Sequence, residues 1–514
     1  MSTSAILQAS LSQAQLAMAD GDTPAARRAY HQASLLAPQE AGILLDLATT
    51  CLADHDPAQA LEHARQAARL TSGWRVESVL ATACRQLNQA DAAAEHLGAA
   101  LAAPDLPVAM RRSTLQQLAD VQLNAFGDAR GAALSLQAAA QGDAALTLDA
   151  ELAGLVADLY EGERSATTLS AGFAALAARL RPPVAPSMSA GRSPQAPRSR
   201  PRIGLLSQQF CASPVGFLTL GALTQLARDA DLLFFDRGAK ADWAHSAFQA
   251  IARHWLPCAK LDARQLHRLL SEADLDAVID LSGWTDVQAL RALVGRPVAR
   301  QLKWVGGQSL STGLRCFDGF VTDARQAPAA AARLYTEPLL RAQHGYVTYR
   351  AAPYAPELVA AAARPPEPKG RPARGVYALV SNPAKISAAT VAALQALRPR
   401  KLVLIDQRWR HEGTRQAAGR RLGALLDQAE FITPASHPDY LQALAGLDAS
   451  FVDTRPYSMG LTAIELRLLG KHVVTSPPSP VALMAQRHCS AHLGARRFDH
   501  HAELAGQLLG WCRA

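Results

Sequence analysis

The segment best suited to chemistry is 453–470, DTRPYSMGLTAIELRLLG, in which a predicted strand ends in a Pro/Ser/Gly turn and a helix begins near Leu461. A helix N-terminus offers unpaired amides and the positive end of the helix dipole, and both favour a diphosphate. Glu465 lies one turn into this helix, where its carboxylate could accept hydrogen bonds from ribose hydroxyls. Thr462 and Glu465 are equally spaced as a capping box, which would stabilise any helix start. Spacing alone leaves both interpretations open.

Two groups of short apolar runs predict the sheets that position this turn. Between residues 201 and 363 the runs are 203–207, 232–236, 277–281, 302–305 and 317–322; beyond the break at 364–374, RPPEPKGRPAR, they are 376–380, 402–405, 431–433, 450–453 and 472–475. Helical stretches separate the runs, and such alternation indicates parallel sheets covered by helices. Ligands bind at the carboxyl ends of such strands, so the loops after Val380, Thr433 and Asp453 are the candidate binding loops.

Residues 1–180 predict helices with an internal repeat. Ala26, Tyr30, Ala33 and Pro38 recur 34 positions later as Ala60, Ala64, Ala67 and Ser72; a third copy is Ala93, Leu97 and Ala100, and a looser fourth is Ala132, Leu136 and Ala139. This period resembles that of the tetratricopeptide family, although another Ala-rich array of helical hairpins would share much of the pattern. Residues 181–200, rich in Pro, Ser and Arg, read as a linker.

Composition excludes several classes of protein. A formal charge of +8 over 514 residues, without a basic stripe interleaved with aromatics, argues against nucleic-acid binding. The seven cysteines are scattered and never in a C-x-x-C arrangement, so neither a disulfide framework nor a zinc site is expected. The N-terminus lacks a signal-peptide pattern, and no apolar run of about 18 residues exists for a membrane span. We therefore expect a cytoplasmic protein that does not enter the membrane.

With these elements in place, segment 453–470 resembles the donor-site signature of the bacterial O-GlcNAc transferase/SPINDLY-like glycosyltransferases, approximately D-T-x-P-Y-x-G-G-L-T-T-x-E-A-L-x-x-G. The matching residues are Asp453, Thr454, Tyr457, Gly460, Leu461, Thr462, Glu465 and Gly470. Met459 and Ala463 replace the commoner Gly and Thr. Four further blocks agree in order: DLSGWT at 280–285, residues 296–313, SHPDYL at 436–441 and RHCSAHL at 487–493. The resemblance covers roughly residues 200–500.

The resemblance implies roles for residues outside the signature turn. Ser381 and Asn382 begin a segment like the family's N-x-x-x-K, whose lysine, here Lys385, contacts the nucleotide diphosphate. An ammonium there would neutralise charge that develops on the leaving group. Tyr440 is placed to stack on the nucleobase or, equally, to cover the core beneath the loop. His344 resembles a short element near the acceptor side.

The sequence departs from the family on the acceptor side. Residues 207–218 align with S-x-D-F-x-x-H-x-x-x-[HY]-[LF], so that Gln209 replaces the aspartate and Ser213 replaces the histidine often proposed to assist catalysis, with Phe217 following. Trp284 stands where the family has His or Tyr. Because a serine does not titrate near neutral pH, it cannot act as an imidazole-like base.

The expected protein is thus a helical repeat array (1–180), a linker (181–200) and two Rossmann-like halves of a GT-B fold, an acceptor-side half (201–363) and a nucleotide-sugar-binding half (364–514). The expected activity is inverting transfer of GlcNAc or a hexose from a UDP-sugar to Ser, Thr or Asn of a protein held by the repeats, with no cofactor or metal. Transfer of another sugar, such as fucose from GDP, is one alternative. A catalytically weakened repeat scaffold with a regulatory or vestigial sugar-nucleotide site is the other. Homo-oligomerisation stays open.

Overall fold

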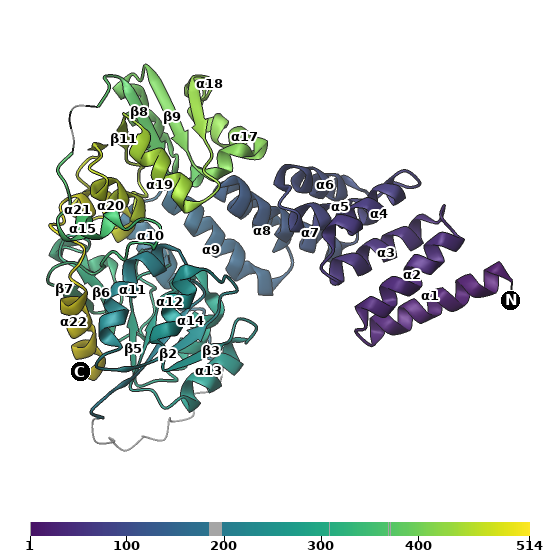
Figure 1. Ribbon diagram of the computed structural model, residues 1–514, viewed down its shortest axis with the longest axis horizontal. Helices are drawn as coiled ribbons and strands as arrows, with labels where there is room; N and C mark the ends of the chain where they lie inside the picture. The colour runs from purple at the N-terminus through teal and green to yellow at the C-terminus, as the bar shows by residue number, and fades with distance from the viewer. Residues whose placement is uncertain (1, 184–197, 308, 369, 371) are drawn as a thin grey trace. The chain divides into compact units, whose positions relative to one another are not determined.

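The computed structural model describes residues 2–183, 198–307, 309–368, 370 and 372–514, so most of the predicted linker lies outside the described residues. The chain divides into two compact units. One, the repeat unit, comprises residues 1–157 together with 408–420; the other, the α/β unit, comprises 158–407 and 421–514. Figure 1 labels most of their helices and strands.

The repeat unit is built from antiparallel helical hairpins. Its helices are α1 (Thr3–Ala19), α2 (Thr23–Leu36), α3 (Ala41–Ala53), α4 (Pro57–Ala68), α5 (Trp74–Gln86), α6 (Ala90–Ala102), α7 (Val108–Asp120), α8 (Ala129–Ala139) and the start of α9 (Ala144–Glu161). Ala26, Ala60 and Ala93, the equivalent alanines of three repeats, are all fully buried. Alanine at these positions lets paired helices approach closely. A π-helical turn, Val121–Phe126, precedes α8 and accounts for the longer spacing of the fourth copy.

A segment distant in sequence belongs to the repeat unit. Residues 408–420, which include most of α17 (Glu412–Leu422), reach the third and fourth repeats. Asp91 accepts hydrogen bonds from the Gly413 amide (2.9 Å) and contacts His411 Nδ1 (3.2 Å). The Phe126 ring lies so close to Gly413 that a Cβ there would come within 2.4 Å of it. Only glycine fits this contact, so the docking of α17 is specific.

The α/β unit contains two parallel sheets. The first has the order β3-β2-β1-β4-β5-β6-β7 and the second the order β10-β9-β8-β11-β12. The strands are β1 (Arg202–Ser207), β2 (Asp231–Asp236), β3 (His254–Pro257), β4 (Ala277–Asp280), β5 (Arg300–Lys303), β6 (Gly319–Asp323), β7 (Leu339–Ala342), β8 (Val376–Val380), β9 (Lys401–Ile405), β10 (Ala429–Ile432), β11 (Ser450–Val452) and β12 (Val473–Val474). The predicted α/β class with two Rossmann-like halves is confirmed.

Helices connect and cover the strands of both sheets. Those of the first half are α10 (Ala166–Ala177), α11 (Pro214–Leu226), α12 (Trp243–Ile251), α13 (Ala263–Glu272), α14 (Val287–Val294) and α15 (Glu357–Ala363); those that follow are α16 (Ala388–Leu397), α18 (Ala424–Asp427), α19 (His437–Gly446), α20 (Leu461–Leu468), α21 (His488–Leu493) and α22 (His501–Arg513). Among the described residues, none of the helices combines the length and apolarity needed to cross a membrane.

Ten of the strands fall on the predicted apolar runs, while the sequence pattern missed two in the described part of the chain. Both are at an edge of the first sheet: β3, sequence HWLP, and β7, sequence LLRA. Edge strands have only one neighbouring strand, and neither of these is fully buried along its length. They therefore lack the continuous apolar run that marks a strand covered on both faces.

Two helices pack with a different part of the fold from the one that the predicted domain boundaries give them. The predicted repeat region extends to residue 180, yet α10 belongs to the α/β unit, where Phe173 is fully buried and its ring lies 5.9 Å from that of Trp284. The final helix, α22, was assigned with 364–514 but packs against α11 of the first half. Its His501 ring occupies the space beside Gly221, where a Cβ would come within 2.2 Å.

Candidate functional site

A cavity of about 370 Å³ opens at the carboxyl ends of three strands of the second sheet. Its lining comes from the loops after β8, β9 and β10, from α19 and α20, and from one residue of the first half, Lys240. The lining residues are Lys240, Val380, Ser381, Asn382, Ile405, Asp406, Gln407, Pro434, Ala435, Ser436, His437, Tyr440 and Thr462. This is the edge at which ligands bind in open parallel sheets.

The structure brings four of the predicted donor-binding residues to this cavity: Ser381, Asn382, Tyr440 and Thr462. The Asn382 side chain accepts a hydrogen bond from the Ala384 amide (3.0 Å), which fixes the turn after β8. The Tyr440 hydroxyl donates to Thr462 Oγ1 (3.1 Å), and burial raises the pKa of this phenol well above its ordinary value. A neutral phenol ring at the cavity wall suits stacking on a base.

The signature turn before α20 is held by the buried carboxylate of Asp453. That carboxylate accepts hydrogen bonds from the Met459 amide and from the Ser458 and Thr475 hydroxyls, each at 2.9 Å. Burial raises the pKa of Asp453, and these three donors oppose that rise. The bonds set the path of the chain into the helix and explain why a short polar sequence forms a fixed turn here.

The structure of the helix start contradicts one of the two sequence interpretations, the capping box. Gly460 is the N-cap of α20, and no side chain there accepts a capping bond, so the capping-box interpretation of Thr462 and Glu465 is wrong. Gly460 and Leu461, the N-cap and the first residue of α20, are not among the residues that line the cavity. The Glu465 carboxylate, 1% exposed, is bonded instead to His437 Nε2 (2.9 Å) and to the Tyr349 hydroxyl (3.4 Å).

Lys385 lies in the turn after β8, half-buried, next to the cavity rather than on its lining. Its ammonium stands 4.1 Å from the centre of the Tyr457 ring, a cation–π contact. Burial lowers the pKa of Lys385 to about 8, and the carboxylates of Asp453 and Asp406 oppose that shift. A proton on this amine is therefore sensitive to any additional negative charge that binds nearby.

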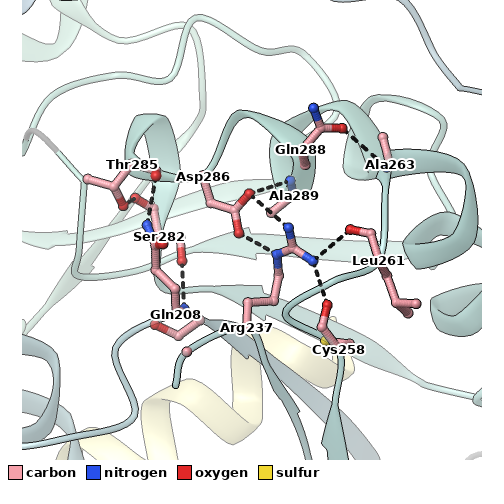
Figure 2. Close-up of polar contacts among 12 residues, drawn as sticks. Gln208, Arg237, Cys258, Leu261, Ala263, Ser282, Thr285, Asp286, Gln288 and Ala289 are labelled. Carbon is pink, nitrogen blue, oxygen red and sulfur yellow. Dashed lines mark hydrogen bonds and ion pairs between the residues drawn. The ribbon is translucent and has the colours of Figure 1, made fainter. Parts of the chain in front are cut away.

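In the first half, a buried ion pair ties together the loops after β2, β3 and β4, and a separate hydrogen bond adds the loop after β1 (Figure 2). The Arg237 guanidinium pairs with Asp286, with both side chains less than 10% exposed, and donates to the carbonyls of Cys258 (2.8 Å) and Leu261 (3.1 Å). Asp286 also caps α14 by accepting from the Ala289 amide (3.0 Å). The Gln208 side chain donates to the Thr285 carbonyl at 2.7 Å. The loops form a fixed platform.

We expect Arg237→Met to lower the free energy of unfolding by about 3–5 kcal/mol, because it leaves the Asp286 carboxylate buried without its partner. Lys401→Met is the matched control: it removes the cation of the exposed Lys401–Glu430 pair (2.8 Å), also in the α/β unit. An exposed pair contributes about 1 kcal/mol or less. Chemical denaturation followed by tryptophan fluorescence measures both, and equal midpoints for the two variants would show that the buried pair is not a structural clamp.

The predicted acceptor-side residues occupy structural positions. Phe217 is 2% exposed, with its ring 4.8 Å from that of His437, and Trp284 packs on Phe173. Gln209 is half-buried in the loop after β1, and its carbonyl accepts from the Ser213 hydroxyl (3.1 Å). Ser213 is the N-cap of α11, where its hydroxyl accepts from the Gly216 amide.

We expect Ser213→Ala to cost about 1 kcal/mol of stability through the lost cap, and Ser213→Asp to retain most of it, since aspartate is an equally good N-cap. Because a serine hydroxyl is no base at neutral pH, turnover by Ser213→Ala should stay within a few-fold of the wild type. Thermal unfolding and rate measurements on the two variants test this. A more than tenfold loss of turnover in a folded Ser213→Ala protein would give the hydroxyl a chemical role.

His344 is not brought to the main cavity. It is exposed and lines a separate small recess with His492 and His500. Sequence reasoning conversely missed Lys240, Asp406 and Gln407 as cavity residues. Their position could have indicated them, because they follow the carboxyl ends of β2 and β9. They were missed because recognisable motifs occur only in the loop after β8 and in the loops before α19 and α20.

Comparisons with known proteins agree with this geometry. The chain is 25% identical over 272 residues to a tomato protein (Solanum lycopersicum) named probable UDP-N-acetylglucosamine–peptide N-acetylglucosaminyltransferase SPINDLY, and 24% identical over 271 residues to a Petunia hybrida protein of the same name. Each match covers 49% of this chain and 28% of the relative. Over about half of its length the chain is therefore similar to SPINDLY proteins. No family model matches it.

A solved structure extends the likeness to the whole fold of the chain. An O-GlcNAc transferase variant from Thermobaculum terrenum superposes with a TM-score of 0.58 at 22% identity, over 100% of this chain and 94% of that one. The fold is thus a helical repeat array followed by GT-B, as predicted. The chain spans less than a third of the length of the plant relatives it matches.

Proposed function

We propose that this chain transfers a sugar, GlcNAc or a hexose, from a UDP-sugar to a hydroxyl or amide of a protein acceptor, with inversion at the sugar. The observation that carries the proposal is the 370 Å³ cavity at the carboxyl ends of β8, β9 and β10, flanked by Lys385 and by the start of α20. The names of the plant relatives and the family signature at 453–470 support a nucleotide sugar as the ligand.

In this proposal different residues at the cavity contact different parts of the donor. Tyr440 stacks on the base, Ser381 and Asn382 bind the nucleotide, and Lys385 neutralises the charge that grows on the diphosphate as the sugar departs. Lys240, 67% exposed at the cavity rim, adds a second cation from the acceptor-side half. With these charges in place the transfer needs no metal ion, and the fixed Arg237–Asp286 platform positions the acceptor.

The repeat unit supplies the protein-binding part of the proposal. Stacked helical hairpins form extended surfaces that suit an extended segment of a partner chain. The protein acceptor is therefore expected to contact the repeats as well as the catalytic loops.

The test begins with calorimetric titration of UDP, with GDP and ADP alongside, and continues with turnover of UDP-N-acetylglucosamine. Intact mass spectrometry of proteins coexpressed with the chain then seeks acceptors that gain one sugar mass. Tighter binding of GDP than of UDP would favour another donor, such as GDP-fucose. UDP binding without any turnover would favour the scaffold alternative, and absence of nucleotide binding at millimolar concentration would refute the proposal.

A further inference from the structure

A series of hydrogen bonds links a buried carboxylate to an exposed hydroxyl through an imidazole on the cavity wall. The Glu465 carboxylate lies 2.9 Å from His437 Nε2, and His437 Nδ1 lies 2.8 Å from the Tyr354 hydroxyl. His437 also lines the 370 Å³ cavity. Nothing in the sequence signature joins these three residues, because they come from α20, from the first turn of α19 and from the loop before α15.

The chemistry of the three groups fixes which group donates each hydrogen bond. An ionised carboxylate only accepts hydrogen bonds, so His437 Nε2 carries the proton that binds Glu465. In a neutral imidazole the other nitrogen is then an acceptor, and it takes its hydrogen bond from the Tyr354 hydroxyl. Burial raises the pKa of Tyr354, so this phenol keeps its proton at neutral pH. In the resting state Tyr354 therefore donates to His437, and His437 donates to Glu465.

Exposure decreases in the same order, from Tyr354 to Glu465. The side chains of Glu465 and His437 are 1% and 23% exposed, and Tyr354 is 41% exposed. The outer hydroxyl is therefore open to a reactant, while the inner carboxylate is shielded from water. A carboxylate, an imidazole and a hydroxyl in series form the arrangement by which a hydroxyl proton is transferred onto an imidazole that the carboxylate stabilises.

Neighbouring rings hold the imidazole in place. The Phe217 ring lies 4.8 Å from it on one side, and the Tyr440 ring is stacked at 5.7 Å. The Tyr349 hydroxyl donates to Glu465 (3.4 Å) and fixes the carboxylate in turn. The titratable and charged groups that face His437 are Glu465, Tyr354 and Tyr440, with Lys240 and Asp406 on the wall of the same cavity. Of these, Glu465 and Tyr354 make hydrogen bonds to the imidazole.

We propose that Tyr354, His437 and Glu465 form the proton relay that deprotonates the acceptor, the task for which Ser213 is chemically unsuited. The proposal rests on the proposed transfer of a sugar. Tyr354 is the group that contacts the acceptor hydroxyl, and His437 and Glu465 act through it.

The step balances as follows. The acceptor oxygen forms its bond to the anomeric carbon, and the bond from that carbon to the diphosphate oxygen breaks with its electron pair leaving on UDP. The acceptor proton passes to the Tyr354 oxygen while the proton of Tyr354 passes to His437 Nδ1. The imidazolium formed is stabilised by Glu465 until it releases its proton to solvent. General-base catalysis of this kind contributes about 10²- to 10⁴-fold.

The test compares Tyr354→Phe and Glu465→Gln with the wild type in the full-length chain. The reactions are release of UDP from UDP-N-acetylglucosamine with water as acceptor, and transfer to a mixture of serine- and threonine-containing peptides. Tyr377→Phe is the matched control: it removes a phenol hydroxyl at the amino end of β8, the end of the strand opposite the cavity. UDP affinity measured by calorimetry shows that each variant retains its donor site.

We expect Tyr354→Phe to lower kcat by about 10²- to 10⁴-fold with UDP affinity within about threefold of the wild type. Glu465→Gln should also lower kcat with UDP affinity within about threefold of the wild type, since the lost negative charge no longer stabilises the imidazolium formed during the step. Tyr377→Phe should match the wild type.

The relay and the proposed function fail in different ways. A wild type that binds UDP but releases none from the sugar nucleotide overturns the proposed function and the relay with it. A wild type that turns over, with Tyr354→Phe equally fast, overturns the relay alone. A Glu465→Gln variant that loses UDP affinity and keeps the wild-type kcat at saturating donor returns Glu465 to the donor site and likewise overturns the relay.

Discussion

Lys385→Met should reduce sugar transfer by about 10²- to 10³-fold or more while the protein stays folded. The substitution removes the charge that, in the proposed function, stabilises the departing diphosphate, and loss of one such electrostatic group has effects of this size. Methionine retains much of the length and the apolar stem of lysine, so its packing on the Tyr457 ring should survive. Steady-state rates with saturating donor, with circular dichroism as the check on folding, make the measurement.

The pH dependence gives an independent test of the same residue. Because the pKa of Lys385 is about 8, the unliganded protein loses this charge as the pH rises through 8, and UDP affinity should fall over that range. Binding of a diphosphate favours the protonated amine, so calorimetry at pH 8.5 should detect proton uptake on binding. In Lys385→Met both effects should vanish. Wild-type turnover in that variant would remove Lys385 from the diphosphate site.

A chain that begins at Gly73, and so lacks helices α1 to α4, should lose about 10²-fold in kcat/KM on protein acceptors yet act almost normally on short peptides. The second contact surface for the acceptor is removed, and loss of one of two linked binding sites has effects of 10² or more. The start point keeps Asp91, Phe126 and Asp128, which bind residues 408–420. UDP affinity should stay within a few-fold.

The activity of a shorter chain would be harder to interpret. Starting at residue 200 would remove α10, whose Ser170 hydroxyl donates to the Leu334 carbonyl (2.6 Å) and whose buried Phe173 covers Trp284. Loss of activity there would report a damaged α/β unit rather than acceptor binding. For the Gly73 chain, equal loss on peptides and proteins would contradict the acceptor-binding role of the repeats, as would full activity on both.

Much of the fold was readable because it depends on local pattern. The 34-residue spacing of Ala26 and Ala60 predicts close helix pairs, and both alanines are fully buried. Apolar runs such as 376–380 and 203–207 predict strands that the structure places at Val376–Val380 and Arg202–Ser207. Repeat packing and strand burial each require particular residue types at short, regular intervals, and a single sequence displays such intervals directly.

The candidate site could be predicted only in part, because only some of its residues lie in local sequence patterns. Ser381, Asn382, Tyr440 and Thr462 could be named because they lie in motifs beside strand ends or a helix start. What the sequence by itself determined was therefore the repeat array, the two parallel sheets and the turn that precedes α20.

Tertiary structure alone decided which distant residues meet. It brings Tyr354 to His437 across 83 positions and His437 to Glu465 across 28. It also assigns Ser213 to a helix cap, α22 to the first half and residues 408–420 to the repeats. These pairings depend on how whole elements pack, and a hydrogen bond between side chains leaves no periodic trace in either segment. The sequence therefore supplies the elements and the turn before α20, whereas packing brings Tyr354, His437 and Glu465 together.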